Sequence, residues 1–209
     1  MNIEVICHEK KRGLIMTVCM TLAVLIVCGV GFFIWQNMQP EIPSEQKEKI
    51  TGHAMWPYYD FSGAVDASAV IVYGKSGEPG NTQKFWGKSG DNPGDYYREV
   101  PMEAIQVLKG EARSDNTVYC IEPGGETLDK VYELEGTTPF EAGKEYVLFL
   151  AEEGWVLAPE AMIPVENGMI TTHLVPSASQ EAESDDSANT PVTMPVEDYL
   201  TLIEKELEK

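Results

Sequence analysis

The sequence predicts a mainly β domain with a short helix near its start and a second helix at its end, behind one N-terminal transmembrane helix. Three patterns indicate this arrangement. Residues 14–35 are apolar and uncharged, 56–175 hold short runs of β-branched and aromatic residues, and 193–209 have apolar residues at helical spacing. About five to seven short strands, together with one long and bent strand, favour a small closed or half-closed barrel.

The uncharged run 14–35 is long enough to cross a bilayer. As a helix rising about 1.5 Å per residue it would extend roughly 33 Å, against a hydrocarbon core of about 30 Å. Basic residues at 10–12 precede it, and the chain after it is strongly acidic. The positive-inside rule therefore predicts a cytoplasmic segment 1–13 and an extracytoplasmic C-terminal domain. We expect a single-pass signal-anchor protein of the cell membrane.

A cleaved signal peptide is the main alternative to a retained anchor. Its apolar region usually spans about 7–15 residues and is followed by a small-x-small cleavage site. The run here is longer, and residues 36–40 contain no such site. Lipid attachment would need a small residue directly before a cysteine, whereas valine precedes both Cys19 and Cys28. The sequence therefore favours an anchor that stays in the membrane.

Charge and cysteine content restrict the partners and the chemistry. The formal net charge is −19, which repels phosphate backbones, so we predict no nucleic-acid partner. Cys120 is the one cysteine of the extracytoplasmic part and sits in a strand-like run, so it cannot form an intradomain disulfide there. We expect it to be a small buried residue, because a cysteine nucleophile would need His53 or His173 beside it.

Composition divides the exported chain. Residues 36–55 are polar and predict a tether with room for a short helix at 44–50; the barrel domain follows at 56–175. Residues 176–192 are acidic and poor in apolar side chains, which predicts a disordered linker. The segment 193–209 predicts an amphipathic helix that docks either on the domain or on a partner. Its apolar face consists of Tyr199, Leu200, Ile203 and Leu207.

Within the domain, residues 60–67 predict a short helix. The predicted strands are 69–73, 97–108, 117–121, 146–150 and 155–157, with a last hairpin over 164–170. The alternation along 97–108 changes phase near Ala104 and Ile105, as a β-bulge would produce. Asn167 and Gly168 form the strongest short hairpin signal in the chain.

Several segments in a fixed order support a resemblance. They are DASAVIVYGK (66–75), AIQVLKG (104–110), EPGGE (122–126), AGKEYVLFL (142–150) and IPVENGMI (163–170). Their order resembles bacterial membrane-anchored or secreted proteins of unknown function, whose domains are similar to the OB-like barrels of the tissue-inhibitor-of-metalloproteinases and netrin type. The resemblance implies an OB-like barrel. It does not imply protease inhibition, because that family uses disulfides and a free N-terminal cysteine.

Motifs that would indicate an enzyme are incomplete. The triplets 74–76 and 87–89 both read Gly-Lys-Ser, but a phosphate loop needs an earlier glycine where Ala69 and Thr82 stand. Residues 91–95 resemble a calcium loop whose third ligand position is a proline, so a turn is expected. We therefore predict no catalytic residue, no metal site and no cofactor.

Aromatic residues give the best indication of a binding site. The candidate ligand-binding residues are Trp56, Tyr58, Tyr59, Phe85, Trp86, Tyr96 and Tyr97. Barrels of this kind bind ligands across the strand face and its loops, although the same rings could instead fill the barrel ends. We expect an interaction module whose partners are the bilayer, through 14–35, and a protein or an envelope polymer. An extracytoplasmic hydrolase that uses His173, or a purely structural envelope component, is the alternative.

Overall fold

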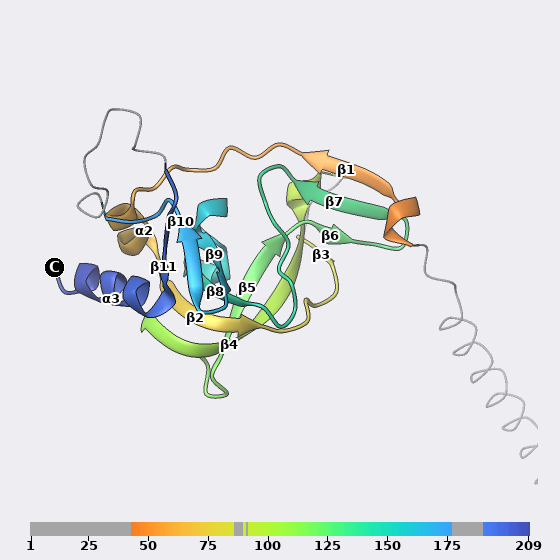
Figure 1. Ribbon diagram of the computed structural model, residues 1–209. Coiled ribbons are helices and arrows are strands. Elements are labelled where there is room, and N and C mark those ends of the chain that lie inside the picture. Colours follow the sequence, from red (N-terminus) through yellow and green to blue (C-terminus); the bar gives the residue numbers. More distant parts are fainter. Residues whose placement is uncertain (1–42, 86–89, 91, 177–189) are drawn as a thin grey trace, which may run out of the picture. The chain divides into compact units, whose positions relative to one another are not determined.

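Most strands of the chain belong to one antiparallel sheet. The computed structural model describes residues 43–85, 90, 92–176 and 190–209. The strands of the sheet are β2 (Val70–Ser76), β3 (Gln83–Lys84), β4 (Tyr96–Lys109), β5 (Thr117–Pro123), β8 (Glu145–Leu150), β9 (Met162–Glu166), β10 (Met169–Thr172) and β11 (Val192–Pro195). Seven of them follow the order β11-β10-β9-β8-β2-β4-β3, and β5 pairs with β4 as well (Figure 1). The prediction of a mainly β fold is therefore confirmed.

Strand β4 is bent where the sequence predicts a bulge. Tyr73 of β2 pairs with Gln106, but the next residue pairs with Ala104, so Ile105 has no partner on β2. A second register shift of the same kind follows between Ile71 and Val72. An extra residue in one strand bends it and increases its twist. The bend lets one half of β4 pair with β2 while the other half pairs with β5.

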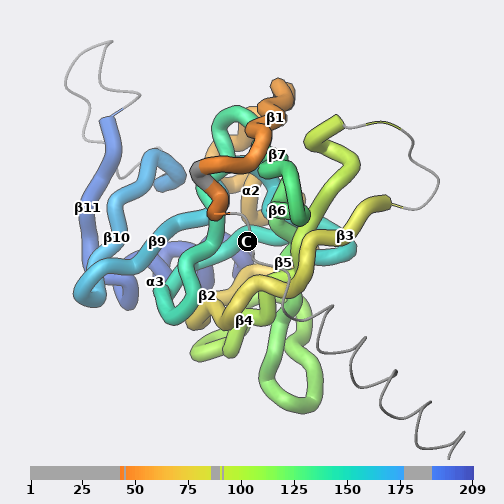
Figure 2. The backbone as a smooth tube through the Cα atoms, turned by 90° about the vertical axis from the view of Figure 1, so that its right-hand side faces the viewer, coloured from red at the N-terminus to blue at the C-terminus, as the bar shows by residue number. Residues whose placement is uncertain are grey.

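The sheet curls but is not closed into a barrel. Figure 2 shows β10 and β11 at one side of the domain and β3 at the other. The free edge of β5 forms no ladder with the segment after β8, but an isolated bridge joins Ile121 and Trp155. Residues 155–157, predicted as a strand, form two such bridges and no strand, because they follow a tight turn in which Glu153 has a left-handed φ of 63°. The hairpin at Asn167 and Gly168 is formed by β9 and β10, as predicted.

A second, three-stranded sheet contains residues that composition assigned to the tether. Its strands are β1 (Glu48–Gly52), β7 (Lys130–Leu134) and β6 (Gly125–Glu126), and β1 runs parallel to β7. In place of the short helix expected at 44–50 there are a 3-10 turn at Ser44–Gln46 and then β1. The half-buried Lys47 joins the chain just before β1 to the end of β6. Its Nζ lies 2.5 Å from Glu126 Oε1 and donates to the Thr127 carbonyl at 2.6 Å.

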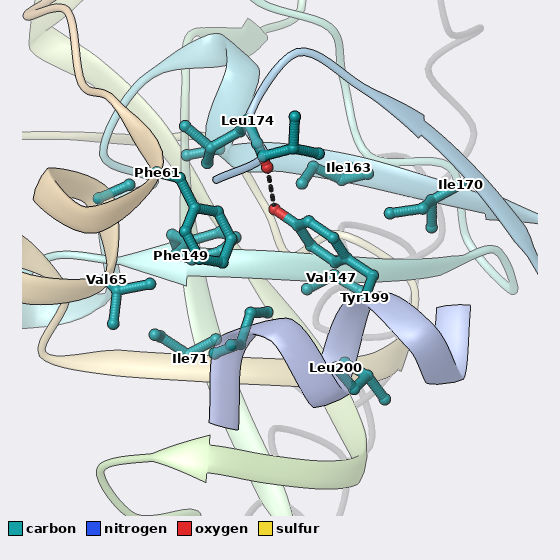
Figure 3. Packing of buried hydrophobic residues seen from close by; sticks show 14 of the residues in the cluster. Phe61, Val65, Ile71, Val147, Phe149, Ile163, Ile170, Leu174, Tyr199 and Leu200 are labelled. Atoms are coloured by element: carbon teal, nitrogen blue, oxygen red, sulfur yellow. Dashed lines mark hydrogen bonds between the residues drawn. The ribbon is translucent and has the colours of Figure 1, made fainter. Parts of the chain in front are cut away.

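Two helices cover one face of the main sheet. They are α2 (Phe61–Ala67), capped by Asp60, and α3 (Val196–Leu207). The rings of Phe61 and Tyr199 pack edge to face with centroids 6.0 Å apart, and the Tyr199 hydroxyl donates to the Leu174 carbonyl at 2.8 Å (Figure 3). The last helix was predicted to dock either on the domain or on a partner, and the structure shows it docked on the domain. Residues 177–189 of the predicted linker lie outside the description.

Neither of the two α-helices in the described residues could span a bilayer. The predicted cytoplasmic segment 1–13 and the predicted transmembrane segment 14–35 lie outside the part of the chain that the structure describes.

A second apolar cluster fills the other side of β2. It contains Val72 of β2, Val100 and Met102 of β4, and Leu148 of β8, all fully buried. Cys120 belongs to this cluster, and burial raises the pKa of its thiol to about 12. The prediction of a small buried residue at this position is confirmed.

Docking of α3 predicts a clear difference between two substitutions on one helix. Ile203→Ala should lower the free energy of unfolding of the full chain by about 2–4 kcal/mol, because Ile203 is fully buried and its truncation leaves a cavity. Leu207→Ala, at a position 36% exposed, should cost less than about 1 kcal/mol. Urea unfolding measures both values. Equal losses would contradict the packing of this helix on the sheet.

Candidate functional site

A narrow apolar slot lies between two tryptophans that are far apart in the sequence. Trp56 is in the segment between β1 and α2, and its indole Nε1 donates to the Glu135 carbonyl at 3.2 Å. Trp155 follows the turn after β8. Both rings line the slot, together with Phe140 and Met162, and the cavity volume is about 40 Å³. By the same measure one water needs roughly 10–15 Å³, so the slot has room for one short apolar group.

A row of stacked rings continues from the slot toward β4. The Trp155 ring stacks on Phe85 with centroids 5.6 Å apart, and Phe85 stacks on Tyr97 at 4.5 Å. The Tyr97 hydroxyl donates to Gln83 Oε1 at 3.1 Å, which fixes the end of the row. The slot and the row together form what we name the aromatic strip: Trp56, Trp155, Phe85 and Tyr97.

The other predicted ligand-binding residues lie in different surroundings. Tyr58 is 93% exposed, two residues beyond Trp56. Tyr59 is half-buried and packs against the core below α2 and α3. Tyr96 is buried and stacks on Tyr132 with centroids 3.7 Å apart, so it contributes to packing. Trp86 lies outside the described residues.

Trp155 is the strip residue that sequence reasoning missed. It was treated as part of a strand, and its place in a site depends on Phe85, which is 70 positions away in the chain. The sequence signal is the Glu152-Glu153-Gly154 turn before it. In the structure Gly154 has a φ of 88°, and a Cβ there would come within 2.3 Å of the Tyr119 carbonyl oxygen. This close approach brings Trp155 to the edge of β5.

A buried ion pair separates the slot from a larger polar cavity. Arg98 Nη2 donates to Glu122 Oε1 at 2.7 Å, and the Glu122 side chain is 7% exposed. Arg98 Nε and Glu122 Oε2 are buried without a hydrogen-bond partner. Glu122, Pro123 and Thr137 line both the slot and the second cavity, which has a volume of about 290 Å³.

The Glu122 carboxyl is in an unfavourable place for a charge. Desolvation by burial raises its pKa, and this effect exceeds the opposing effects of the Arg98 guanidinium and the Phe140 amide. A buried carboxylate is tolerated when a counter-ion and hydrogen bonds compensate for lost water. Arg98 supplies this compensation only in part, which makes the pair sensitive to any change at either residue.

Groups that could indicate catalysis are dispersed. His53 pairs with Glu135, and His173 is exposed near the end of the main sheet. Ser76 of the first Gly-Lys-Ser triplet donates to the Glu141 carbonyl at 2.5 Å and so has a structural role. Within the residues described, no group of three metal-binding side chains occurs. The second triplet, 87–89, lies outside them.

The predicted calcium-like loop has turn geometry where it is described. Residues Pro93–Asp95 form a 3-10 turn, and the Asn92 side chain accepts a hydrogen bond from the Gly94 amide at 3.1 Å. Asp91 is outside the description. The expected turn is therefore found over 92–95.

Comparison with known proteins does not identify a family. No protein-family model matches the sequence, and neither does any curated protein.

The ion pair predicts a pH-dependent loss of stability. Arg98→Met should destabilise the full chain by about 3 kcal/mol near pH 7, because Glu122 is then buried without a counter-ion. The pKa of Glu122 in the folded chain lies above its ordinary value of 4.5. The protonated Glu122 carboxyl therefore favours the folded state below pH 4.5, and this contribution to the free energy of unfolding is lost as the pH rises through the folded pKa. The loss should therefore be smaller at pH 4. Denaturant unfolding at the two pH values measures it.

The double variant Arg98→Met/Glu122→Gln is the matched control for this experiment. It removes both charges, so its pH dependence should be flatter than that of Arg98→Met alone. An equal loss at pH 4 and pH 7 for the single variant would show that Glu122 does not cause it.

Proposed function

We propose that this protein is a membrane-anchored extracytoplasmic binding module whose ligand is a protein or an envelope polymer. The aromatic strip supports this proposal, because it joins a slot open to solvent to a row of three stacked rings, and its four residues come from separate segments of the chain. Aromatic rings are a costly choice for a purely exposed surface and a common one for binding sites. Residues 14–35 supply the anchor and residues 1–13 the cytoplasmic end.

The OB-like barrel type belongs to the same proposal. Its support is the order β5-β4-β2-β8-β9 around a bulged central strand, with the curled sheet open between β5 and the segment after β8. In OB-like folds ligands bind on the strand face and the adjoining loops. The aromatic strip follows this open side, since Trp155 lies opposite Ile121 of β5.

The orientation in the membrane can be tested by labelling one introduced cysteine. Leu128→Cys places a thiol at a position 75% exposed, whereas native Cys120 is buried and its raised thiol pKa makes it unreactive. A membrane-impermeant maleimide should label Leu128→Cys on intact cells. The unsubstituted chain should be labelled only after permeabilisation, at Cys7. Labelling of position 128 only after permeabilisation would refute the proposed orientation.

Binding by the aromatic strip can be tested by photo-crosslinking in intact cells. Tyr58→p-benzoylphenylalanine places the probe two residues from Trp56 at an exposed position, and Ile105, 55% exposed on the bulge of β4, is the matched control position. The probe at 58 should yield a discrete adduct that the control lacks. Trp155→Ala should reduce this adduct at least tenfold, because it removes one wall of the slot.

Identical adducts at both positions, or an adduct that does not depend on Trp155, would contradict binding at the strip. The absence of any adduct would favour the structural-component alternative. Hydrolysis of the captured molecule, abolished by substitution of His173, would favour the hydrolase.

A further inference from the structure

The chemistry of the slot restricts what can occupy it. Its walls are mainly carbon, from residues that include Trp56, Phe140, Trp155 and Met162. Its one charged lining group, Glu122, already receives a hydrogen bond from Arg98 at 2.7 Å. A sugar ring presents hydroxyl groups that need hydrogen-bond partners when buried. A slot of about 40 Å³ with such walls fits the end of one branched apolar side chain better.

Unpaired carboxylates flank this slot. Glu152 and Glu153 directly precede the Gly154-Trp155 turn, and Glu160 follows the lining residue Pro159; all three are exposed. None of them forms an ion pair with any other residue that the structure describes. The neighbouring acids Glu122 and Glu135 are paired, with Arg98 and His53. Three unpaired negative charges therefore lie next in sequence to residues that line the slot.

The backbone beside the slot is available for an extended ligand. Residues 53–59, which include Trp56, belong to no helix or strand, and no backbone hydrogen bond from them to another described residue is formed. Backbone donors and acceptors without partners in the described chain can form hydrogen bonds with the backbone of an extended peptide. A carbohydrate chain has no equivalent alternation of donors and acceptors.

We infer that the slot binds one branched apolar side chain of an extended peptide segment whose neighbouring residues are basic. This inference rests on the proposed binding function and identifies its ligand as a protein. The apolar side chain inserts between Trp56 and Trp155, and lysine or arginine side chains on either side meet Glu152, Glu153 and Glu160. The formal net charge of −19 favours the same class of partner and disfavours anionic envelope polymers.

Selection from a peptide library tests this specificity. The full chain in detergent micelles is presented with a display library of random linear peptides. Enriched peptides should share one Leu, Ile or Val flanked by Lys or Arg. Enrichment of acidic or uncharged peptides would overturn the inference. A soluble β-1,4-linked N-acetylglucosamine oligomer is the carbohydrate probe, and its binding at the slot would overturn it as well.

Two sets of variants locate the enriched peptide. Thr138→Phe should cover the exposed side of the slot and lower affinity at least tenfold, whereas Thr201→Phe, exposed on α3, should leave it unchanged. The triple exchange of Glu152, Glu153 and Glu160 to Gln should lower affinity about tenfold at low salt and much less at high salt. The matched control triple exchanges Glu103, Glu111 and Glu208 to Gln, which are exposed and line neither cavity.

Binding that is insensitive to Thr138→Phe would overturn the inference. If no peptide is enriched but the adduct at position 58 still depends on Trp155, the peptide assignment fails and the binding module stands. If that adduct is absent as well, both proposals fail.

Discussion

The bend in β4 is the constraint on which the rest of the molecule depends. Because Ile105 is left unpaired by β2, the strand bends there, between the end that pairs with β5 and the end that pairs with β2 alone. Residues 102–109, on both sides of the bulge, pair with β2 and, through it, hold β8 and the helix-covered core. Residues 97–103 pair with β5, which provides Ile121 and Glu122 to the slot. The bulge bends β4 and increases its twist, so that the sheet curls between these two sets of neighbours.

The parallel pairing of β1 with β7 positions Trp56 at the slot. It brings the chain that follows the predicted membrane segment across the loop after β7, so that Trp56 reaches the Glu135 carbonyl 79 residues away. Lys47 secures this arrangement with a partly buried ion pair to Glu126 and a hydrogen bond to the Thr127 carbonyl. One wall of the slot is therefore held by the segment nearest the proposed anchor.

Local patterns could be predicted from the sequence, and long-range ones could not. The helix at 60–67, the bulge near Ile105, the hairpin at Asn167 and the buried Cys120 each depend on neighbouring residues and are found as expected. Strand β1 was missed because it is a short polar edge strand whose partner lies about 82 residues away. Trp155 of the aromatic strip was missed for the same reason, because its ring partner Phe85 lies 70 positions away. Tyr96, by contrast, was included because sequence alone cannot distinguish a ring that packs from a ring that binds.

The ion pair of Arg98 and Glu122 is the feature that packing alone does not explain. Replacing a buried ion pair by apolar side chains of similar size is often neutral or stabilising. Here the pair stands on adjacent strands at the boundary between an apolar slot and a polar cavity, with one oxygen and one nitrogen left without hydrogen bonds. Glu122 lines both the slot and the larger cavity, whereas Arg98 lines only the larger one. The pair therefore places the one charged group of the slot lining next to its counter-ion, and the exposed carboxylates of Glu152, Glu153 and Glu160 are left for a basic ligand.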